Sequence, residues 1–213
     1  MSTVSCRKNY NTYARNSKID CIFFYFYGIK MNYLIMSDFH RYNYSGALFF
    51  GGGYLYNFHR VLRVAQSTKN IMVRSFCRLL LKHYREKYGL EISPETKIGK
   101  GLYLGHAFNI TINPKAVIGN NCNIHKGVLI GAENRGKRKG APTIGNKVWI
   151  GINSVIVGKI KIGDDVLIAP CSYVNCDVPC HSVVFGNPCK IKHKENATEG
   201  YINNIYEENT LFD

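Results

Sequence analysis

Residues 144–168 read IGNKVWIGINSVIVGKIKIGDDVLI. An isoleucine recurs at every sixth position of this stretch, and a small or apolar residue stands four positions after each isoleucine. These two residues of every six point inward. Each strand is therefore short, and the chain turns a corner after each repeat. Three repeats close one coil, so the period predicts a parallel β-helix.

The same period extends in both directions from this stretch. With one two-residue slip and one loop, it continues through Ile92, Ile98, Leu104, Ile112, Ile118, Ile124, Ile130 and Val174. Glycine often follows the aliphatic residue, where it supplies turn conformations that a side chain would obstruct. Thirteen positions in phase disfavour an antiparallel protein with coincidental spacing. The β-helix is therefore predicted over residues 91–193.

The residues ahead of the repeats have a helical period. Apolar residues recur at three and four positions over 55–67 and 70–88, and the second segment ends at Gly89, a typical helix stop. Residues 1–35 have no sustained period and are predicted to be an arm of low order. Residues 36–90 are predicted to form a helical segment, and residues 194–213 a tail.

The composition bounds the class of protein and its partners. The 213 residues include 28 Lys and Arg against 14 Asp and Glu, a net charge of +14 that favours anionic partners. Nucleic acid ranks last among them, because the chain has no nucleic-acid-binding motif. The longest apolar stretch near the N-terminus, 22–29, is too short to span a bilayer. We expect a cytoplasmic protein, with peripheral contact of the basic helices at the inner face of the membrane left open.

The cysteines and histidines do not predict a metal site. The eight cysteines would stay reduced in the cytoplasm, and their spacing matches no zinc-ligand pattern. The γ-carbonic anhydrases share this kind of solenoid, but they need two histidines separated by five residues, which this chain lacks. No metal cofactor is predicted.

The run from Ile98 to His106, IGKGLYLGH, together with the slip and the single loop, resembles the hexapeptide-repeat acyltransferases. Within them it is similar to the serine acetyltransferases and their relatives in capsule and polysaccharide gene clusters. The resemblance covers roughly residues 37–193. It implies an enzyme with a left-handed β-helix, acetyl-CoA as donor, homotrimers, and active sites between neighbouring subunits.

The resemblance also implies catalytic residues. His106 matches the family's general base, and Glu91 stands where the family has an aspartate that orients that histidine. An imidazole has an ordinary pKa near 6.5, which suits a base at neutral pH, and a carboxylate on its other nitrogen fixes the tautomer. His125 lies about one coil beyond His106. It contacts the acceptor, acts as a second base, or is a surface residue, and the sequence leaves these three readings open.

The donor site follows from the same resemblance. The closing motif GNPCKIK, 186–192, contains two lysines, which the resemblance places near the nucleotide end of CoA. Backbone groups of two hexads are implied to form the groove for the pantetheine arm. The implied CoA-binding residues are Gly151, Ile152, Ala169, Pro170, Lys190 and Lys192.

Departures from the family pattern guide the acceptor prediction. Serine acetyltransferases have an aspartate before the catalytic histidine and an Arg-His pair after the loop, which hold the amino acid's charges, whereas this chain has Gly105, Gly140 and Ala141. An unpaired charge in a site costs several kcal/mol. We therefore expect the acceptor to be a sugar hydroxyl in polysaccharide or capsule-type biosynthesis, with Arg138 and Lys139 of the loop contacting a phosphate.

Two other functions stay open at this point. One is serine O-acetylation in cysteine biosynthesis, and the other is a non-catalytic β-helix scaffold, since a fold does not fix a function. The sequence does not say which sugar or which hydroxyl would be acetylated.

Overall fold

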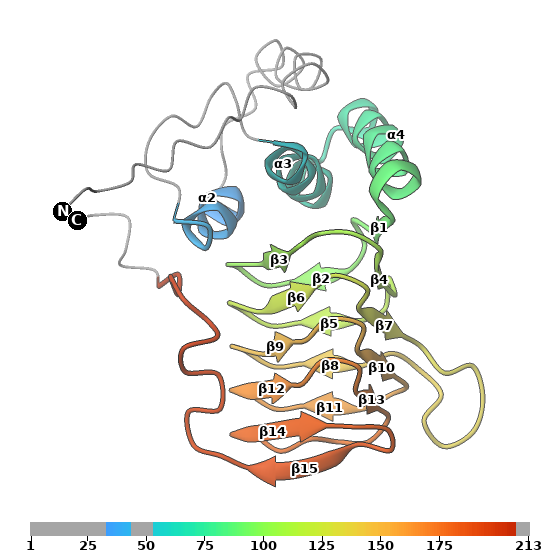
Figure 1. The fold of residues 1–213 in the computed structure, drawn as a ribbon. Coiled ribbons are helices and arrows are strands. Elements are labelled where there is room, and N and C mark those ends of the chain that lie inside the picture. The colour runs from blue at the N-terminus through green and yellow to red at the C-terminus, as the bar shows by residue number, and fades with distance from the viewer. Residues whose placement is uncertain (1–32, 44–52, 208–213) are drawn as a thin grey trace, which may run out of the picture.

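A computed structural model describes residues 33–43 and 53–207 of the chain. It consists of helices followed by a parallel β-solenoid, so the predicted β-helix with an N-terminal helical segment is confirmed (Figure 1). The predicted arm, 1–35, lies outside the described residues except for its last three. The helices are α2 (Tyr33–His40), α3 (Tyr54–Ser67) and α4 (Ile71–Tyr88).

The ends of α4 have clear physical causes. Asn70 caps its N-terminus by accepting hydrogen bonds from the backbone N–H groups of Met72 and Val73, at 2.9 and 3.2 Å. Gly89 ends it with φ of 65°, a left-handed conformation that glycine adopts without cost, as the sequence predicts. Within the described ranges, no helix has the length and apolarity needed to cross a membrane.

The solenoid has three faces, each a sheet to which successive coils contribute one strand. The first face contains β1 (Leu90–Ile92), β4 (Ile110–Ile112), β7 (Leu129–Gly131), β10 (Val155–Val157) and β13 (Tyr173–Val174). The second contains β2 (Lys97–Ile98), β5 (Val117–Ile118), β8 (Thr143–Ile144) and β11 (Lys161–Ile162). The third contains β3 (Tyr103–Gly105), β6 (Asn123–His125), β9 (Trp149–Ile150), β12 (Val166–Ile168), β14 (Ser182–Phe185) and β15 (Lys190–His193).

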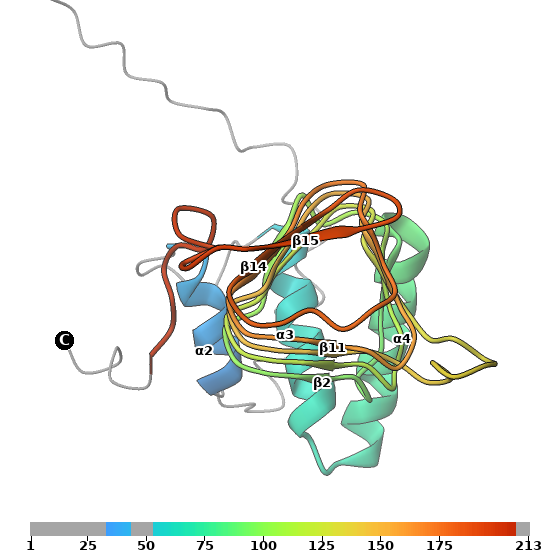
Figure 2. The same cartoon turned by 90° about the horizontal axis from the view of Figure 1, so that it is seen from below.

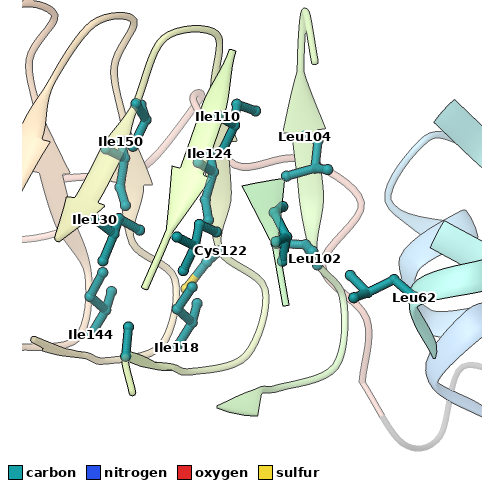
Figure 3. Close-up of a cluster of buried hydrophobic side chains, with 14 of the residues drawn as sticks. Leu62, Leu102, Leu104, Ile110, Ile118, Cys122, Ile124, Ile130, Ile144 and Ile150 are labelled. Carbon is teal, nitrogen blue, oxygen red and sulfur yellow. The ribbon is translucent and has the colours of Figure 1, made fainter. Parts of the chain in front are cut away.

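The core consists of columns of aliphatic side chains that run along the solenoid axis. All strand pairs are parallel except β14 with β15, and the register aligns Ile112 with Ile130 and Leu104 with Ile124. Figure 3 shows Ile124, Ile130, Ile144 and their neighbours filling the interior between the strands. Strands about 4.8 Å apart bring equivalent side chains into contact, and burying each one stabilises the fold by roughly 1.5–3 kcal/mol. The six-residue period therefore corresponds to these columns.

Side chains from α2, the turn that follows it and α3 cover the open edge of the first coil, and we call this contact the cap. Asp38 accepts a hydrogen bond from the Leu102 N–H at 2.8 Å, and the Tyr42 hydroxyl accepts one from the Leu104 N–H at 2.8 Å. Arg63 donates to two carbonyl oxygens of the same coil, those of Ile98 at 2.9 Å and Gly99 at 2.7 Å. Figure 1 shows the helices at this end of the solenoid. The cap thus supplies the backbone partners that a preceding strand would supply.

The centre of the cap is a buried cluster of ionisable side chains. Both Asp38 oxygens accept from the Arg63 guanidinium, at 2.7 and 2.9 Å, and His59 Nδ1 lies 3.0 Å from Asp38 Oδ2. The three side chains have an exposed fraction of 0%. Burial acts to raise the pKa of Asp38, but the charge of Arg63 and the hydrogen bonds from His59 and Arg63 outweigh it and hold this pKa below its ordinary value.

The residues after β15 fold back along the outside of the solenoid. Asp165 accepts hydrogen bonds from the backbone N–H groups of Ala197 and Thr198, at 2.9 and 3.0 Å. Farther along, the Asn121 side chain accepts from the Tyr206 N–H at 2.9 Å and donates to the Tyr206 carbonyl at 3.1 Å. The tail therefore runs from the last coils back towards the capped end (Figure 1).

Candidate active site

The edge where the third face passes into the first face of the next coil carries His106 and the residues predicted to bind the pantetheine arm. We call this edge the third corner, and it comprises residues 106–109, 126–128, 151–154 and 169–172. Backbone hydrogen bonds hold its layers together, from Lys126 N–H to Gly105 C=O at 3.0 Å and from Cys171 N–H to Ile152 C=O at 2.9 Å. Residues from four coils therefore line one edge of the molecule.

His106 lies at the top layer of the third corner, directly after β3. Its side chain is exposed, and its backbone has a φ of 51°, in the left-handed region. Asn153 and Cys171 at the same corner also have positive φ, so this conformation is a feature of the turn. The histidine is thus presented to solvent by a tight turn on a rigid coil.

His125 occupies the next layer and lies against the same turn. Its Nδ1 lies 2.9 Å from the Ile150 carbonyl oxygen, so Nδ1 carries the proton and Nε2 offers a lone pair. Burial, followed by the nearby charge of His106, lowers the pKa of His125 against the opposing effect of the hydrogen bond to Ile150. The structure therefore brings His106 and His125 together as electrostatic neighbours.

Gly105 is required by the packing of His125. A Cβ atom at Gly105 would lie 2.2 Å from His125 Cδ2 and 2.6 Å from Nε2, closer than atoms can approach. The hydrogen bond to Ile150 favours the present position of the ring, so a side chain at residue 105 would have to displace it. The identity of residue 105 consequently reflects the fit between two coils.

We expect Gly105→Ala to lower the free energy of unfolding by about 1–3 kcal/mol, because the added methyl displaces the His125 ring. Urea unfolding of Gly105→Ala, His125→Ala and the double variant measures the coupling between the two positions. The double variant should recover most of the loss caused by Gly105→Ala. If the losses in free energy of unfolding of the two single variants simply add in the double variant, the contact would be contradicted.

Glu91 lies beside the third corner but does not bond to His106. It is the exposed middle residue of β1, opposite Thr111 in β4. No hydrogen bond or ion pair joins Glu91 to His106 within the ranges that the structure describes. The orienting role of Glu91 stays a prediction.

A groove separates α4 from the first face, and sequence reasoning missed it. Its volume is about 450 Å³, and Glu91 is the acidic residue of its β1 wall. Arg78, Lys82 and Arg85 line it from one side of α4. Their spacing of three and four positions was the available signal, since it puts all three cations on one helix face.

The residues expected to bind the pantetheine arm meet at the third corner. A Cβ atom at Gly151 would lie 2.5 Å from the Pro170 nitrogen, so these two layers are in direct contact. Ile152 and Pro170 are exposed there, while the Ala169 N–H already donates to the Val184 carbonyl at 2.8 Å. The corner therefore presents a surface that runs along the axis from His106.

Lys190 and Lys192 lie at the opposite end of the third face from His106. Both are exposed on β15, which is five strand positions from β3, or roughly 24 Å at the usual strand spacing. Only a ligand that extends along the axis could reach both these lysines and His106.

Arg138 and Lys139 do not approach His106 within one chain. They lie in the loop between β7 and β8, which leaves from the opposite edge of the first face and projects outward (Figure 2). Arg138 forms an ion pair with Glu133 of the same loop at 3.3 Å. The loop therefore lies away from the third corner of its own chain.

Comparisons with known proteins identify relatives of this chain. Residues 141–176 match the family model described as bacterial transferase hexapeptide (six repeats). Serine acetyltransferase 2 of Arabidopsis thaliana is 35% identical over 149 residues, which cover 70% of this chain and 46% of that protein. The serine acetyltransferase of Helicobacter pylori is 36% identical over 107 residues, covering 50% of this chain and 63% of that protein.

A solved structure has a similar fold. The serine acetyltransferase of Neisseria gonorrhoeae in complex with serine aligns with a TM-score of 0.60 and 29% identity, over 74% of this chain and 67% of that one. This chain spans between 46% and 63% of the length of the two curated relatives above.

These relatives overturn the acceptor prediction. The expected sugar acceptor and the expected capsule or polysaccharide branch are wrong, because the similar proteins are serine acetyltransferases. That prediction rested on the missing charges at Gly105, Gly140 and Ala141, and at Gly105 the structure shows that an added Cβ would lie 2.2 Å from His125 Cδ2. The chain therefore carries hexapeptide repeats over residues 141–176 and is similar in sequence and fold to the serine acetyltransferases.

Proposed function

We propose that this chain is an acetyl-CoA-dependent O-acetyltransferase whose acceptor is the hydroxyl of serine. The observation that carries the proposal is the third corner, where the exposed His106 shares one edge with the layers of Ile152 and Pro170. The similarity to serine acetyltransferases supports the choice of acceptor and donor. The similarity to these relatives does not support a contact of the basic N-terminal helices with a membrane.

In the proposed reaction, His106 is the general base. Its imidazole takes the proton of the serine hydroxyl as the oxygen attacks the carbonyl carbon of the thioester. The tetrahedral intermediate then collapses, the C–S bond breaks, and the proton passes to the departing sulfur. Glu91, which is exposed on β1, would orient His106.

Acetyl-CoA would lie along the solenoid axis at the third corner. Its thioester would lie beside His106, the pantetheine arm would cross Gly151, Ile152, Ala169 and Pro170, and the nucleotide end would lie towards Lys190 and Lys192. The exposed lysines supply positive charge for phosphate groups. The extended arm accounts for site residues that are spread over five strand positions.

The complete site would form between two copies in a homotrimer. One chain presents His106 at one edge of its first face and the basic loop at the other edge, so side-by-side copies bring the loop of one to the third corner of the next. Closed threefold association would repeat this contact three times. Arg138 and Lys139 would then act on the neighbouring site.

A thiol-release assay tests the proposed function. Purified protein with acetyl-CoA is mixed with L-serine, with a panel of free and nucleotide-linked sugars, or with no acceptor. We expect thiol release to depend on L-serine, with O-acetylserine identified by mass spectrometry. If none of the acceptors in the panel causes thiol release, the result would instead favour a non-catalytic protein.

A further inference from the structure

The groove between α4 and the first face has a basic wall. Arg78, Lys82 and Arg85 recur at intervals of four and three residues, so they lie on the same side of the helix. The facing wall is formed by β1, β4 and β7 and includes Glu91 and Thr111. A volume of about 450 Å³ accommodates a small molecule.

The cations of this wall differ in how far other groups neutralise them. Arg78 forms an ion pair with Glu95, and Lys82 lies 3.8 Å from Glu86 on the same helix, where both side chains are about 60% exposed. The interaction free energy of such an exposed ion pair is small, so the charge of Lys82 is only weakly neutralised. The Arg85 guanidinium has no hydrogen bond or ion pair to any residue in the described ranges. The groove therefore holds positive charge that is available to a ligand.

One wall of the groove belongs to α4, and the C-terminal end of this helix contacts the turn that carries His106. The Arg85 side of α4 continues to Tyr88 at the helix end, and the ring of Tyr88 lies 5.5 Å from that of Phe108, measured between centroids. The Tyr88 carbonyl accepts a hydrogen bond from the Asn109 N–H at 2.9 Å. The turn that carries His106 is thus attached to the same end of α4 that presents Arg85.

We propose that Arg85, assisted by Lys82, binds the carboxylate of the amino-acid acceptor. This inference rests on the proposed function and names the group that recognises the acceptor. Gly140 and Ala141 leave the loop without the Arg-His pair expected for this task, and the α4 groove supplies cations from another element. A guanidinium can bind a carboxylate through two parallel hydrogen bonds, which would fix the orientation of the amino acid in the groove.

The test compares L-serine with L-serinamide, which keeps the ammonium and hydroxyl groups but has no carboxylate. We expect Arg85→Gln to lower kcat/KM for L-serine by roughly 10- to 100-fold, the effect of losing a hydrogen bond to a charged group, mainly through a higher KM. The same variant should change kcat/KM for L-serinamide less than threefold. Arg85→Lys should restore part of the loss with L-serine.

Lys69→Gln is the matched control, because it removes one exposed positive charge just before α4 and outside the groove. It should leave both acceptors unaffected. An equal loss for both acceptors in Arg85→Gln, or a change in KM for acetyl-CoA alone, would overturn the carboxylate site.

Calorimetric titration with L-serine separates this inference from the proposed function. If the wild-type protein releases no thiol but binds L-serine, and Arg85→Gln does not, the carboxylate site stands and the proposed function fails. If L-serine binds both proteins equally, the carboxylate site fails whatever the activity.

Discussion

Replacing His106 by asparagine is expected to lower kcat for acetyl transfer by roughly 10²- to 10⁴-fold, the contribution of a positioned general base. Asparagine is the informative choice because it tolerates the left-handed conformation that His106 adopts, with its φ of 51°. Since the side chain is exposed, the fold should not change. Steady-state kinetics with acetyl-CoA and L-serine measure the loss, and thermal unfolding checks that the variant remains folded.

His125→Asn is the control that assigns the base. His125 lies in the next layer and offers Nε2 as an acceptor, so it could take the same proton. We expect its replacement to reduce kcat less than His106→Asn does. A larger loss in His125→Asn, with His106→Asn close to wild type, would transfer the role of base to His125.

The largest effect on stability is expected for Asp38→Asn, which should lower the free energy of unfolding by about 3–5 kcal/mol. The substitution keeps the side-chain volume but removes the negative charge that faces Arg63, and both side chains are fully buried. Arg63 would then be an unpaired charge in the interior. Urea unfolding at neutral pH measures the change, and a Glu86→Gln variant, which alters an exposed ion pair, should stay within about 0.5 kcal/mol of wild type.

The same pair predicts a pH dependence of stability. The pKa of Asp38 in the folded protein lies below its ordinary value of 3.8, so the folded state favours the ionised carboxylate. The resulting stabilisation is present above pH 3.8 and is lost as the pH falls through the folded-state pKa. The difference between wild type and Asp38→Asn should therefore shrink in strong acid. A difference that is small at neutral pH and constant down to strong acid would contradict the ion pair.

The solenoid could be predicted from the sequence because each coil repeats the same requirement. Ile130 and Ile156, for example, occupy one column, and every coil must fill that column with an aliphatic side chain. The helices could be predicted for a similar reason, since one apolar side recurs along α3 and α4. Local periodicity thus determines both parts of the fold.

The cap, the tail and the groove could not be predicted in this way. Asp38 bonds to Arg63, 25 residues away, and to Leu102, 64 residues away, and such long-range contacts leave no periodic signal. The acceptor prediction was wrong for a related reason. It rested in part on Gly105, and the identity of this residue does not reveal that His125 of the next coil lies against it.

The cap also determines how copies of this protein can associate. A β-helix with a bare first coil offers unpaired strand edges, to which the last coil of another copy could add, and repeated addition would build an endless fibre. Here the backbone groups of Leu102 and Leu104 are already bonded to Asp38 and Tyr42. At the other end, β15 reverses direction and pairs with β14. The cap therefore prevents another copy from adding a parallel strand at Leu102 and Leu104, and the reversed β15 presents an edge of the opposite direction to the other strands of its sheet.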